Sequence, residues 1–376
     1  MPLTRAIDLK SDVDRRSVVL FGPRRTGKSH LIQSTLGADR TYDLLHADVF
    51  ARLSRRPSLI REELQPSDRL IVVDEVQKLP SLMDEIHSLI ESTNVRFVLA
   101  GSSARKLRRS HTGLMAGRAR QRRLFPFISR ELGPFDLQRA LNTGLLPPIW
   151  LSDEPWQDLG DYVGEYLTEE IRAEALARNI EAFSRFLQTA ALANSLQLNF
   201  ESIASDAGVP ARTVREYFAL LEDTLVGYTL EPLDMPPRKA VSHAKFYFFD
   251  NGVVNRLIGR REVVEGTDDF GRAFETFLCH ELLAWRAYRQ EDDPVRFWRT
   301  HNGDEVDFVI GDHTAVEVKA TTFATEKHLK GLSRLGGHLT LRRKILVSRD
   351  PTRRRIGDVD VWPWFQFLQA LWADAL

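Results

Sequence analysis

A glycine-rich turn between an apolar strand and a helix is the feature that most constrains this sequence. Residues 17–21 (SVVLF) form a short apolar run, and GPRRTGKS follows directly at 22–29. Such a turn brings consecutive backbone N–H groups and a helix N-terminus together around phosphate oxygens. The sequence therefore predicts a phosphate-binding loop. Its expected members are Gly22, Pro23, Arg24, Arg25, Thr26, Gly27, Lys28 and Ser29.

A second apolar run, LIVVDE at 70–75, ends in two adjacent carboxylates. In loops of this type the lysine reaches the β- and γ-phosphates and the hydroxyl binds Mg²⁺, roles that fall to Lys28 and Ser29. We expect Asp74 to hold the metal ion and Glu75 to polarise the attacking water. The two motifs together predict an ATP·Mg²⁺ site with its own water activator.

Residues 96–103 (RFVLAGSS) form a third apolar run, and this one ends in hydroxyl groups. Ser102 is the candidate for sensing the γ-phosphate or positioning water, with Ser103 in reserve. Serine is also a favoured helix cap. The two hydroxyls therefore either serve the nucleotide site or cap the following helix.

Between Ser92 and Arg130 the sequence has no acidic residue but many basic ones. These cations either supply an arginine to the ATP of a neighbouring subunit, contact nucleic-acid phosphates, or form a solvated face with distant acidic partners. Arg118 is the candidate for the first role, which implies a homo-oligomer such as a hexameric ring. The cations are Arg96, Arg105, Lys106, Arg108, Arg109, Arg118, Arg120, Arg122, Arg123 and Arg130.

Strand and helix patterns alternate up to residue 125, which predicts a parallel sheet covered by helices. Proline-marked breaks at 125–155 and 231–237 separate a helical middle part from a mixed α/β C-terminal part, because proline interrupts regular elements. We therefore expect an α/β chain with domains at 1–135, 136–237 and 238–376. The expected strands are 17–21, 41–45, 70–74, 96–100, 120–125, 245–249, 296–299, 305–310, 315–319 and 344–347.

In the middle part, residues 200–224 predict a short helix, a turn at Gly208 and a second helix, the helix-turn-helix pattern. Residues 226–230 would add the wing of a winged helix. If this unit reads DNA, Arg212, Thr213 and Arg215 face a groove or its phosphates. The same helix pair also serves as an ordinary packing module, and the sequence leaves both interpretations open.

Three acidic residues and a lysine recur in the C-terminal part: Glu275 in a helical segment, Asp307 in GDEVDF, and Glu317 and Lys319 in EVK. On a strand, residues two apart share a face. Asp307 and Glu317 would then meet at one Mg²⁺, and Lys319 would orient or deprotonate a water for attack on a phosphodiester. Alternatively, Glu317 and Lys319 form a strand-face ion pair, or the scaffold persists without turnover.

The composition narrows the class of protein. The chain of 376 residues balances 52 basic against 52 acidic side chains and has one cysteine, Cys279. A single cysteine excludes an intramolecular disulfide framework and a zinc–thiolate cluster. No run approaches the ~20 apolar residues of a bilayer span, so we expect a soluble cytoplasmic chain with no membrane partner.

The segments GPRRTGKS, LIVVDEVQK, FVLAGSS and AGR resemble those of prokaryotic AAA-class P-loop ATPases that carry a C-terminal domain of unknown function. The resemblance implies the AAA strand order and ATP with Mg²⁺ as cofactors. The C-terminal pattern resembles the PD-(D/E)XK nuclease core, which implies a helix-borne acid, two metal ligands and a catalytic lysine at Glu275, Asp307, Glu317 and Lys319. One departure is Ala100, where the family version has a hydroxyl before Gly101.

Three functions follow as hypotheses, and nucleic acid, DNA above all, is the expected partner. The preferred one is an ATP-hydrolysing enzyme that binds and remodels or processes DNA, with a nuclease-like C-terminal domain. The second is a DNA motor or junction remodeller whose C-terminal domain grips DNA without cutting it. The third is an ATP-dependent regulatory switch that acts through the winged helix.

Overall fold

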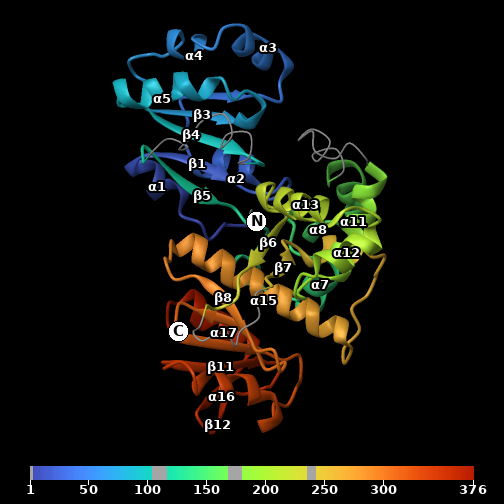
Figure 1. The fold of residues 1–376 in the computed structure, drawn as a ribbon. Helices are drawn as coiled ribbons and strands as arrows, with labels where there is room; N and C mark the ends of the chain where they lie inside the picture. Colours follow the sequence, from blue (N-terminus) through green and yellow to red (C-terminus); the bar gives the residue numbers. More distant parts are fainter. Residues whose placement is uncertain (1–2, 104–116, 168–179, 235–242) are drawn as a thin grey trace. The chain divides into compact units, whose positions relative to one another are not determined.

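The computed structural model describes residues 3–103, 117–167, 180–234 and 243–376 (Figure 1). Its contacts divide the chain into two compact units. The first comprises Met1–Phe127 and Asp223–Val226, and the second comprises Ile128–Glu222 and Gly227–Leu376. The segments predicted as middle and C-terminal domains thus lie mainly in the second unit. No helix within the described ranges is long and apolar enough to cross a membrane.

A five-stranded parallel sheet in the order β2-β3-β4-β1-β5 forms the centre of the first unit. Every neighbouring pair is parallel, which confirms the prediction from the alternating sequence pattern. β1 and β3 have the predicted bounds, β4 is one residue longer at its end, and β2 and β5 each differ from the prediction by one or two residues at both ends. The strands are β1 (Ser17–Phe21), β2 (Arg40–Asp43), β3 (Leu70–Asp74), β4 (Arg96–Gly101) and β5 (Ala119–Arg123).

Both faces of the central strands are buried, because helices cover the sheet and the strands are continuous apolar runs. The amphipathic helix α5 contributes Leu82, Ile86 and Leu89 to the core, and Leu225 joins it from the segment Asp223–Val226. The helices are α1 (Leu9–Arg15), α2 (Lys28–Thr35), α3 (Ala47–Arg55), α4 (Leu59–Glu62), α5 (Leu82–Ser92) and the 3₁₀ turn η1 (Val76–Lys78).

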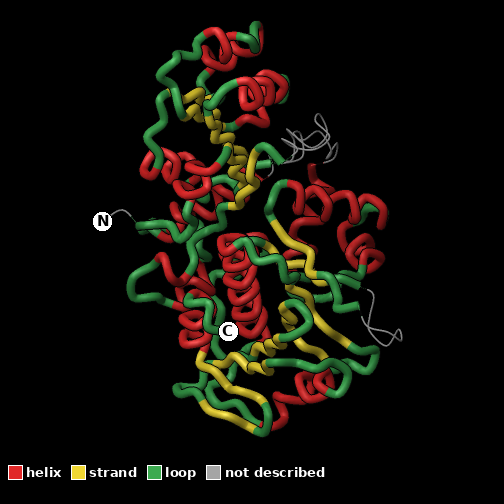
Figure 2. The backbone as a smooth tube through the Cα atoms, turned by 90° about the vertical axis from the view of Figure 1, so that its left-hand side faces the viewer, coloured by secondary structure: helices red, strands yellow, loops and turns green. Residues whose placement is uncertain are grey.

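A six-stranded mixed sheet, β12-β13-β11-β10-β9-β8, lies in the second unit (Figure 2). β8, β9 and β10 form an antiparallel meander, whereas β10 and β11, and β11 and β13, pair in parallel. The predicted mixed α/β C-terminal part is confirmed at this level. The strands are β8 (Val295–Arg299), β9 (Glu305–Ile310), β10 (Thr314–Val318), β11 (Arg343–Ser348), β12 (Arg354–Ile356) and β13 (Val359–Pro363).

Among the described residues of this unit, the longest helix is α15 (Asp268–Arg289), whose first turn is capped by the Thr267 hydroxyl and carries Asp268 and Asp269. Acidic residues at this end favour the helix because they complement its dipole. The other helical segments are η2 (Ser129–Glu131), α7 (Leu137–Thr143), α8 (Pro147–Trp150), α9 (Pro155–Asp161), η3 (Tyr162–Leu167), α11 (Ile180–Leu192), α12 (Phe200–Ala207), α13 (Ala211–Asp223), α14 (Asn251–Leu257), η4 (Glu326–Leu329), α16 (Lys330–Gly336) and α17 (Trp364–Trp372).

The predicted helix pair is present as α12 and α13, separated by Gly208 in the left-handed conformation (φ 67°). The inward residues of α13, including Val214, Phe218 and Leu221, are buried as expected. The predicted wing strand is present as β6 (Gly227–Leu230). It pairs antiparallel with β7 (Lys245–Phe248), a strand that we expected to belong to the C-terminal part. The winged-helix assignment therefore remains a prediction.

Candidate functional sites

The glycine-rich loop connects β1 to α2 at the carboxyl edge of the parallel sheet. Gly27 has φ 88° and stands at the N-cap of α2, where no side chain accepts from the helix N–H groups. Gly22 lies close to the segment that follows β5, and a Cβ atom on Gly22 would come within 2.5 Å of the Leu124 carbonyl oxygen. The positive φ of Gly27 and the close approach of Leu124 to Gly22 therefore both favour glycine over any residue with a side chain. The N–H groups at the start of α2 have no side-chain cap and can bind an anion.

Lys28 lies folded over this loop. Its Nζ donates to the carbonyl oxygens of Gly22 at 2.8 Å and Pro23 at 3.1 Å, and the residue is only 6% exposed. The Thr26 hydroxyl also donates to the Pro23 carbonyl, at 2.8 Å. The Arg5 guanidinium, which sequence reasoning missed, holds the loop from outside through the Thr26 carbonyl at 2.7 Å.

Ser29, at the start of α2, and Asp74, at the end of β3, lie side by side because β1 and β3 end at the same edge of the sheet. The Ser29 hydroxyl donates to Asp74 Oδ2 at 2.6 Å, and Asp74 Oδ1 accepts from the Glu75 N–H at 2.9 Å. A hydroxyl beside a carboxylate is a pair of hard oxygen ligands. The residues present therefore fit the Mg²⁺ that accompanies ATP.

Glu75 follows β3 in the left-handed conformation (φ 54°), which is uncommon for a residue with a side chain. Burial raises the pKa of Glu75, although the charges of Lys28 and Arg24 act in the opposite direction. A carboxylate with a raised pKa accepts a proton more readily. This is the property expected of the predicted water activator.

Gln77 connects Glu75 to the predicted sensor. Its Nε2 donates to Glu75 Oε2 and, at 3.0 Å, to the hydroxyl of Ser102. A Cβ atom on Gly101 would come within 2.5 Å of Gln77 Oε1, so only glycine leaves room for this side chain. Sequence reasoning missed Gln77, for which the only signal was its place two residues after Glu75. The reserve candidate, Ser103, donates to the Asp223 carbonyl at 3.5 Å.

Several cations of the basic stretch have acidic partners that are remote in sequence. Arg118, the candidate finger, contacts Glu91, and Arg122 lies 2.9 Å from Asp12. Arg120 pairs with the same aspartate at 2.5 Å. Arg118 is partly exposed, but Arg122 and Asp12 are buried, so the contacts with Asp12 are not part of a solvated face. The role of Arg118 stays a prediction. Arg105, Lys106, Arg108 and Arg109 lie outside the described residues.

On the helix pair, Arg212 is exposed and lies 3.2 Å from Glu216 within α13. The Arg215 guanidinium stacks 4.9 Å above the ring of Phe200 and approaches Glu201 at 3.5 Å. Thr213, between them, is half-buried. The three residues share one end of α13, and the two arginines engage local carboxylates.

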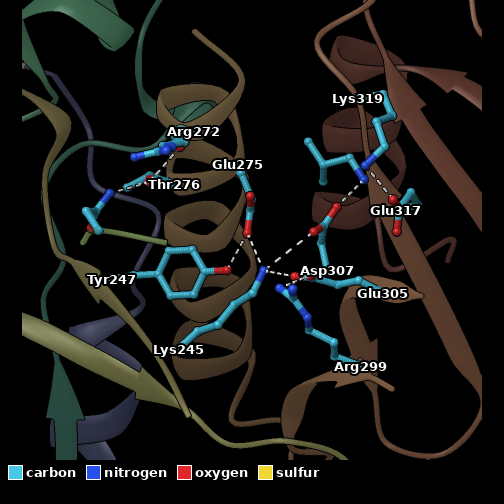
Figure 3. A network of polar contacts seen from close by, with 12 residues as sticks. Lys245, Tyr247, Arg272, Glu275, Thr276, Arg299, Glu305, Asp307, Glu317 and Lys319 are labelled. Atoms are coloured by element: carbon cyan, nitrogen blue, oxygen red, sulfur yellow. Dashed lines mark hydrogen bonds and ion pairs between the residues drawn. The ribbon is translucent and has the colours of Figure 1, made fainter. Parts of the chain in front are cut away.

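The C-terminal candidates converge as the sequence predicted. Val316 on β10 pairs with Phe308 on β9, so the next residues along these antiparallel strands, Glu317 and Asp307, lie side by side. Helix α15 carries Glu275, and Lys319 follows β10 directly. Figure 3 shows these side chains pointing toward one another from the helix and the two strands.

Glu317 and Lys319 form a close ion pair, with Lys319 Nζ 2.5 Å from Glu317 Oε1. The other carboxylate oxygen, Glu317 Oε2, is buried without a hydrogen-bond partner. Burial and the neighbouring Asp307 charge raise the pKa of Glu317 well above its ordinary value. Burial lowers the pKa of Lys319, but the Asp307 and Glu317 charges outweigh it and raise the pKa above its ordinary value. Lys319 is therefore an ammonium, which stabilises charge rather than removing a proton.

A second lysine, Lys245 at the start of β7, lies at the same site and was missed by sequence reasoning. Its Nζ is 3.0 Å from Glu275 Oε1 and 3.6 Å from Asp307 Oδ1, and it also contacts Glu305. The Tyr247 hydroxyl donates to Glu275 at 2.6 Å. The one signal in the sequence was a lysine beginning an otherwise apolar strand, KFYFF.

A cavity of about 450 Å³ opens over these groups. Six lysine and arginine side chains and five carboxylates line it. The cations offer a phosphate positive charge and hydrogen-bond donors. The basic residues that line it are Lys245, Arg272, Arg299, Lys319, Lys327, His328 and Lys330.

A metal ion at this site would have few protein ligands. Among the described residues, no group of three or more His, Cys, Asp or Glu side chains is arranged to hold a metal ion. Asp307 and Glu317 remain as a pair of hard carboxylates, and Glu317 Oε2 lacks a hydrogen-bond partner. These two residues fit one hydrated Mg²⁺, a cation that keeps several of its waters in proteins.

Comparison with known families divides the chain into three parts. Residues 14–133 match the AAA domain. Residues 134–263 and 270–367 match two domains of unknown function, DUF8612 and DUF4143. A comparison with curated proteins gives no match. With the loop geometry, the first match supports a P-loop ATPase that binds a nucleotide, and the other two leave the role of the C-terminal parts open.

Proposed function

We propose that this AAA-type ATPase uses ATP hydrolysis to bind and remodel or process DNA, and that its C-terminal cavity receives the phosphodiester backbone. The observation that carries the proposal is the meeting of Asp307, Glu317 and Lys319 in a cavity that is also lined by the more exposed Arg272 and Lys327, here called its rim. A phosphate chain needs such positive charge. The carboxylates of Asp307 and Glu317 are not needed for phosphate binding alone.

In the first unit, the chain's own groups account for ATP hydrolysis. The Lys28 ammonium exchanges its carbonyl partners for β- and γ-phosphate oxygens, and the N–H groups of α2 contact the same phosphates. Glu75 orients the attacking water and takes its proton. When bound through Ser29 and Asp74, Mg²⁺ neutralises charge on the phosphates. Gln77 keeps the Glu75 carboxylate in position.

In the second unit, Asp307 and Glu317 would hold Mg²⁺, which polarises a phosphodiester oxygen and activates water when bound. Lys319, as an ammonium, stabilises the negative charge that develops on the phosphate. Arg272 and Lys327 at the cavity rim hold the flanking phosphates. The preferred function is therefore ATP-dependent processing of DNA, with cleavage at this cavity.

A second candidate function is a motor or junction remodeller that grips DNA without cutting it. The observation that favours it is the charge pairing at the cavity floor, where both Lys245 and Lys319 already contact carboxylates. A grip needs only the rim cations and no metal. ATP turnover would then move DNA while every strand stays intact.

The test measures the rate of ATP hydrolysis with single-stranded, duplex and branched DNA. Strand cleavage is measured in the same samples. The preferred function predicts DNA-stimulated turnover with Mg²⁺-dependent cleavage that Asp307→Asn and Lys319→Met abolish. Stimulated turnover with no cleavage supports the second candidate. Turnover that none of the three DNA forms changes, without binding of DNA, would refute both.

A further inference from the structure

One buried lysine, Lys245, contacts three of the five carboxylates that line the C-terminal cavity. Lys245 Nζ lies 3.0 Å from Glu275 and 3.6 Å from Asp307, and it contacts Glu305 as well. Figure 3 shows its ammonium between helix α15 and strand β9. The lysine therefore occupies a position at which a cation is surrounded by carboxylate oxygens.

The backbone and a ring fix this lysine in place. Lys245 pairs with Leu230 across β6 and β7 and forms an isolated bridge with Gln197. Its Nζ stands 5.6 Å from the centre of the Phe297 ring, and its side chain is 3% exposed. The Lys245 ammonium is therefore a fixed positive charge of the chain itself, and it does not exchange with solvent ions.

Glu317 differs from the three carboxylates around Lys245, and the fifth, Asp304, pairs with Lys330 at 2.8 Å. Glu317 contacts Lys319 through Oε1, while its Oε2 is buried without a hydrogen-bond partner, and the residue lines the cavity. The adjacent Asp307 accepts the Val318 N–H through Oδ2 at 2.8 Å. Glu317 Oε2 is thus a buried oxygen at the cavity without a hydrogen-bond partner, and Figure 3 shows Glu317 on the far side of Asp307 from the helix that carries Glu275.

We propose that Lys245 is a built-in cation that takes the place of a second metal ion, so that the cavity binds a single divalent cation at Asp307 and Glu317. Sites that act on phosphodiesters often use two metal ions, one on each side of the reacting phosphate. Here a lysine supplies the charge on the Glu275 side. The inference rests on the proposed function for the meaning of the site, although cation binding is measured without DNA.

The test counts Mn²⁺ ions bound per chain, by electron paramagnetic resonance of free Mn²⁺, in the full chain without nucleotide. Asp74→Asn is present in every sample, because it removes the carboxylate of the ATP site. This parent is expected to bind one Mn²⁺, and Asp307→Asn is expected to abolish that binding. Lys245→Met removes the charge with little change in side-chain length and is expected to raise the count to two.

Two controls separate charge from structure. Lys245→Arg keeps the positive charge and is expected to leave the count at one. Lys344→Met removes a lysine that is paired with Asp358 outside the cavity, at 2.5 Å, and is also expected to leave it at one. Circular dichroism shows which variants fold. If Lys245→Met does not fold, Lys245→Gln is measured in its place. A parent count other than one overturns the proposal in either case.

Two ions or none in the parent would overturn the proposal, as would one ion in a folded Lys245→Met chain. The outcome is separable from that of the proposed function. A parent that binds one Mn²⁺ but neither binds nor cuts DNA retains the role of Lys245 and loses the DNA function. A parent that binds two Mn²⁺ and cuts DNA retains the DNA function and excludes the proposed role of Lys245.

Discussion

The two sites of this chain each centre on a buried lysine, but the partners of these lysines differ. Lys28 Nζ donates to two backbone carbonyls and its charge also acts on Glu75, whereas Lys245 and Lys319 are in direct contact with carboxylates. An ammonium gives up a carbonyl for a phosphate at little cost, but separating it from a buried carboxylate leaves a charge unpaired. The first site is therefore built to bind an anion, and the floor of the second is built to balance charge internally.

The largest effect is expected at Lys28. Lys28→Ala removes the charge that meets the β- and γ-phosphates and should lower the ATP turnover number by about 10²- to 10³-fold, the usual loss for one charge-stabilising donor. The measurement is steady-state phosphate release. Lys78→Ala, an exposed lysine of the same unit, is the control and should change little. Near-normal turnover in Lys28→Ala would contradict the assignment of Lys28 as the residue that binds the phosphates of ATP.

Gln77 should have the next largest effect. Gln77→Leu removes the donor to Glu75 while preserving bulk, and a hydrogen bond to a charged group contributes about 1.5–3 kcal/mol. We expect a fall of about 10- to 100-fold in turnover at saturating ATP with nucleotide affinity retained. Ser102→Ala leaves the Gln77–Glu75 contact in place and should cost less. Equal losses in both variants would show that Gln77 acts only through the serine.

The rim of the cavity should bind phosphates independently of its floor. Replacing Arg272 and Lys327 together by alanine removes two positive contacts and should reduce the slope of log affinity against log salt by about 2. Affinity is measured on duplex DNA across a range of salt concentrations. The exposed pair Lys10 and Arg15, replaced in the same way, serves as the control. An unchanged slope would place DNA elsewhere on the molecule.

The smallest effect concerns pH. Because burial raises the pKa of Glu75 in the folded chain, its active carboxylate form is lost as pH falls, earlier than for an ordinary glutamate. The Arg24 charge opposes this shift, so Arg24→Ala should move the acid limb of turnover to still higher pH. The measurement is turnover at saturating ATP against pH. A limb that moves to lower pH would contradict the assignment of Glu75 as the base.

The elements that sequence reasoning found share a local signal. β1 and β3 are continuous apolar runs next to distinctive motifs, so their bounds could be read directly. Two strands were missed: β12 (Arg354–Ile356) lacks the apolar pattern on which strand prediction depends, and the short run of β13 (Val359–Pro363) ends in proline. The convergence of Asp307 and Glu317 followed from strand alternation and an antiparallel turn, both of which are local.

The residues that were missed act over long distances or through unusual backbone geometry. Lys245 meets Glu275 and Asp307 only because β7 packs beside α15 and β9, a tertiary arrangement with no local sequence signal. Gln77 turns back toward Glu75 because Glu75 adopts a left-handed conformation, which sequence patterns do not report for a glutamate. Both sites therefore gained a polar residue that only the folded chain displays.

The most direct test compares phosphate release from ATP by the wild type, Glu75→Gln and Lys319→Met in one experiment. The account predicts Mg²⁺-dependent release by the wild type, loss of about 10²- to 10⁴-fold in Glu75→Gln as for removal of a general base, and nearly unchanged DNA-free release in Lys319→Met. Absence of release by the wild type, or release that survives Glu75→Gln, would contradict it.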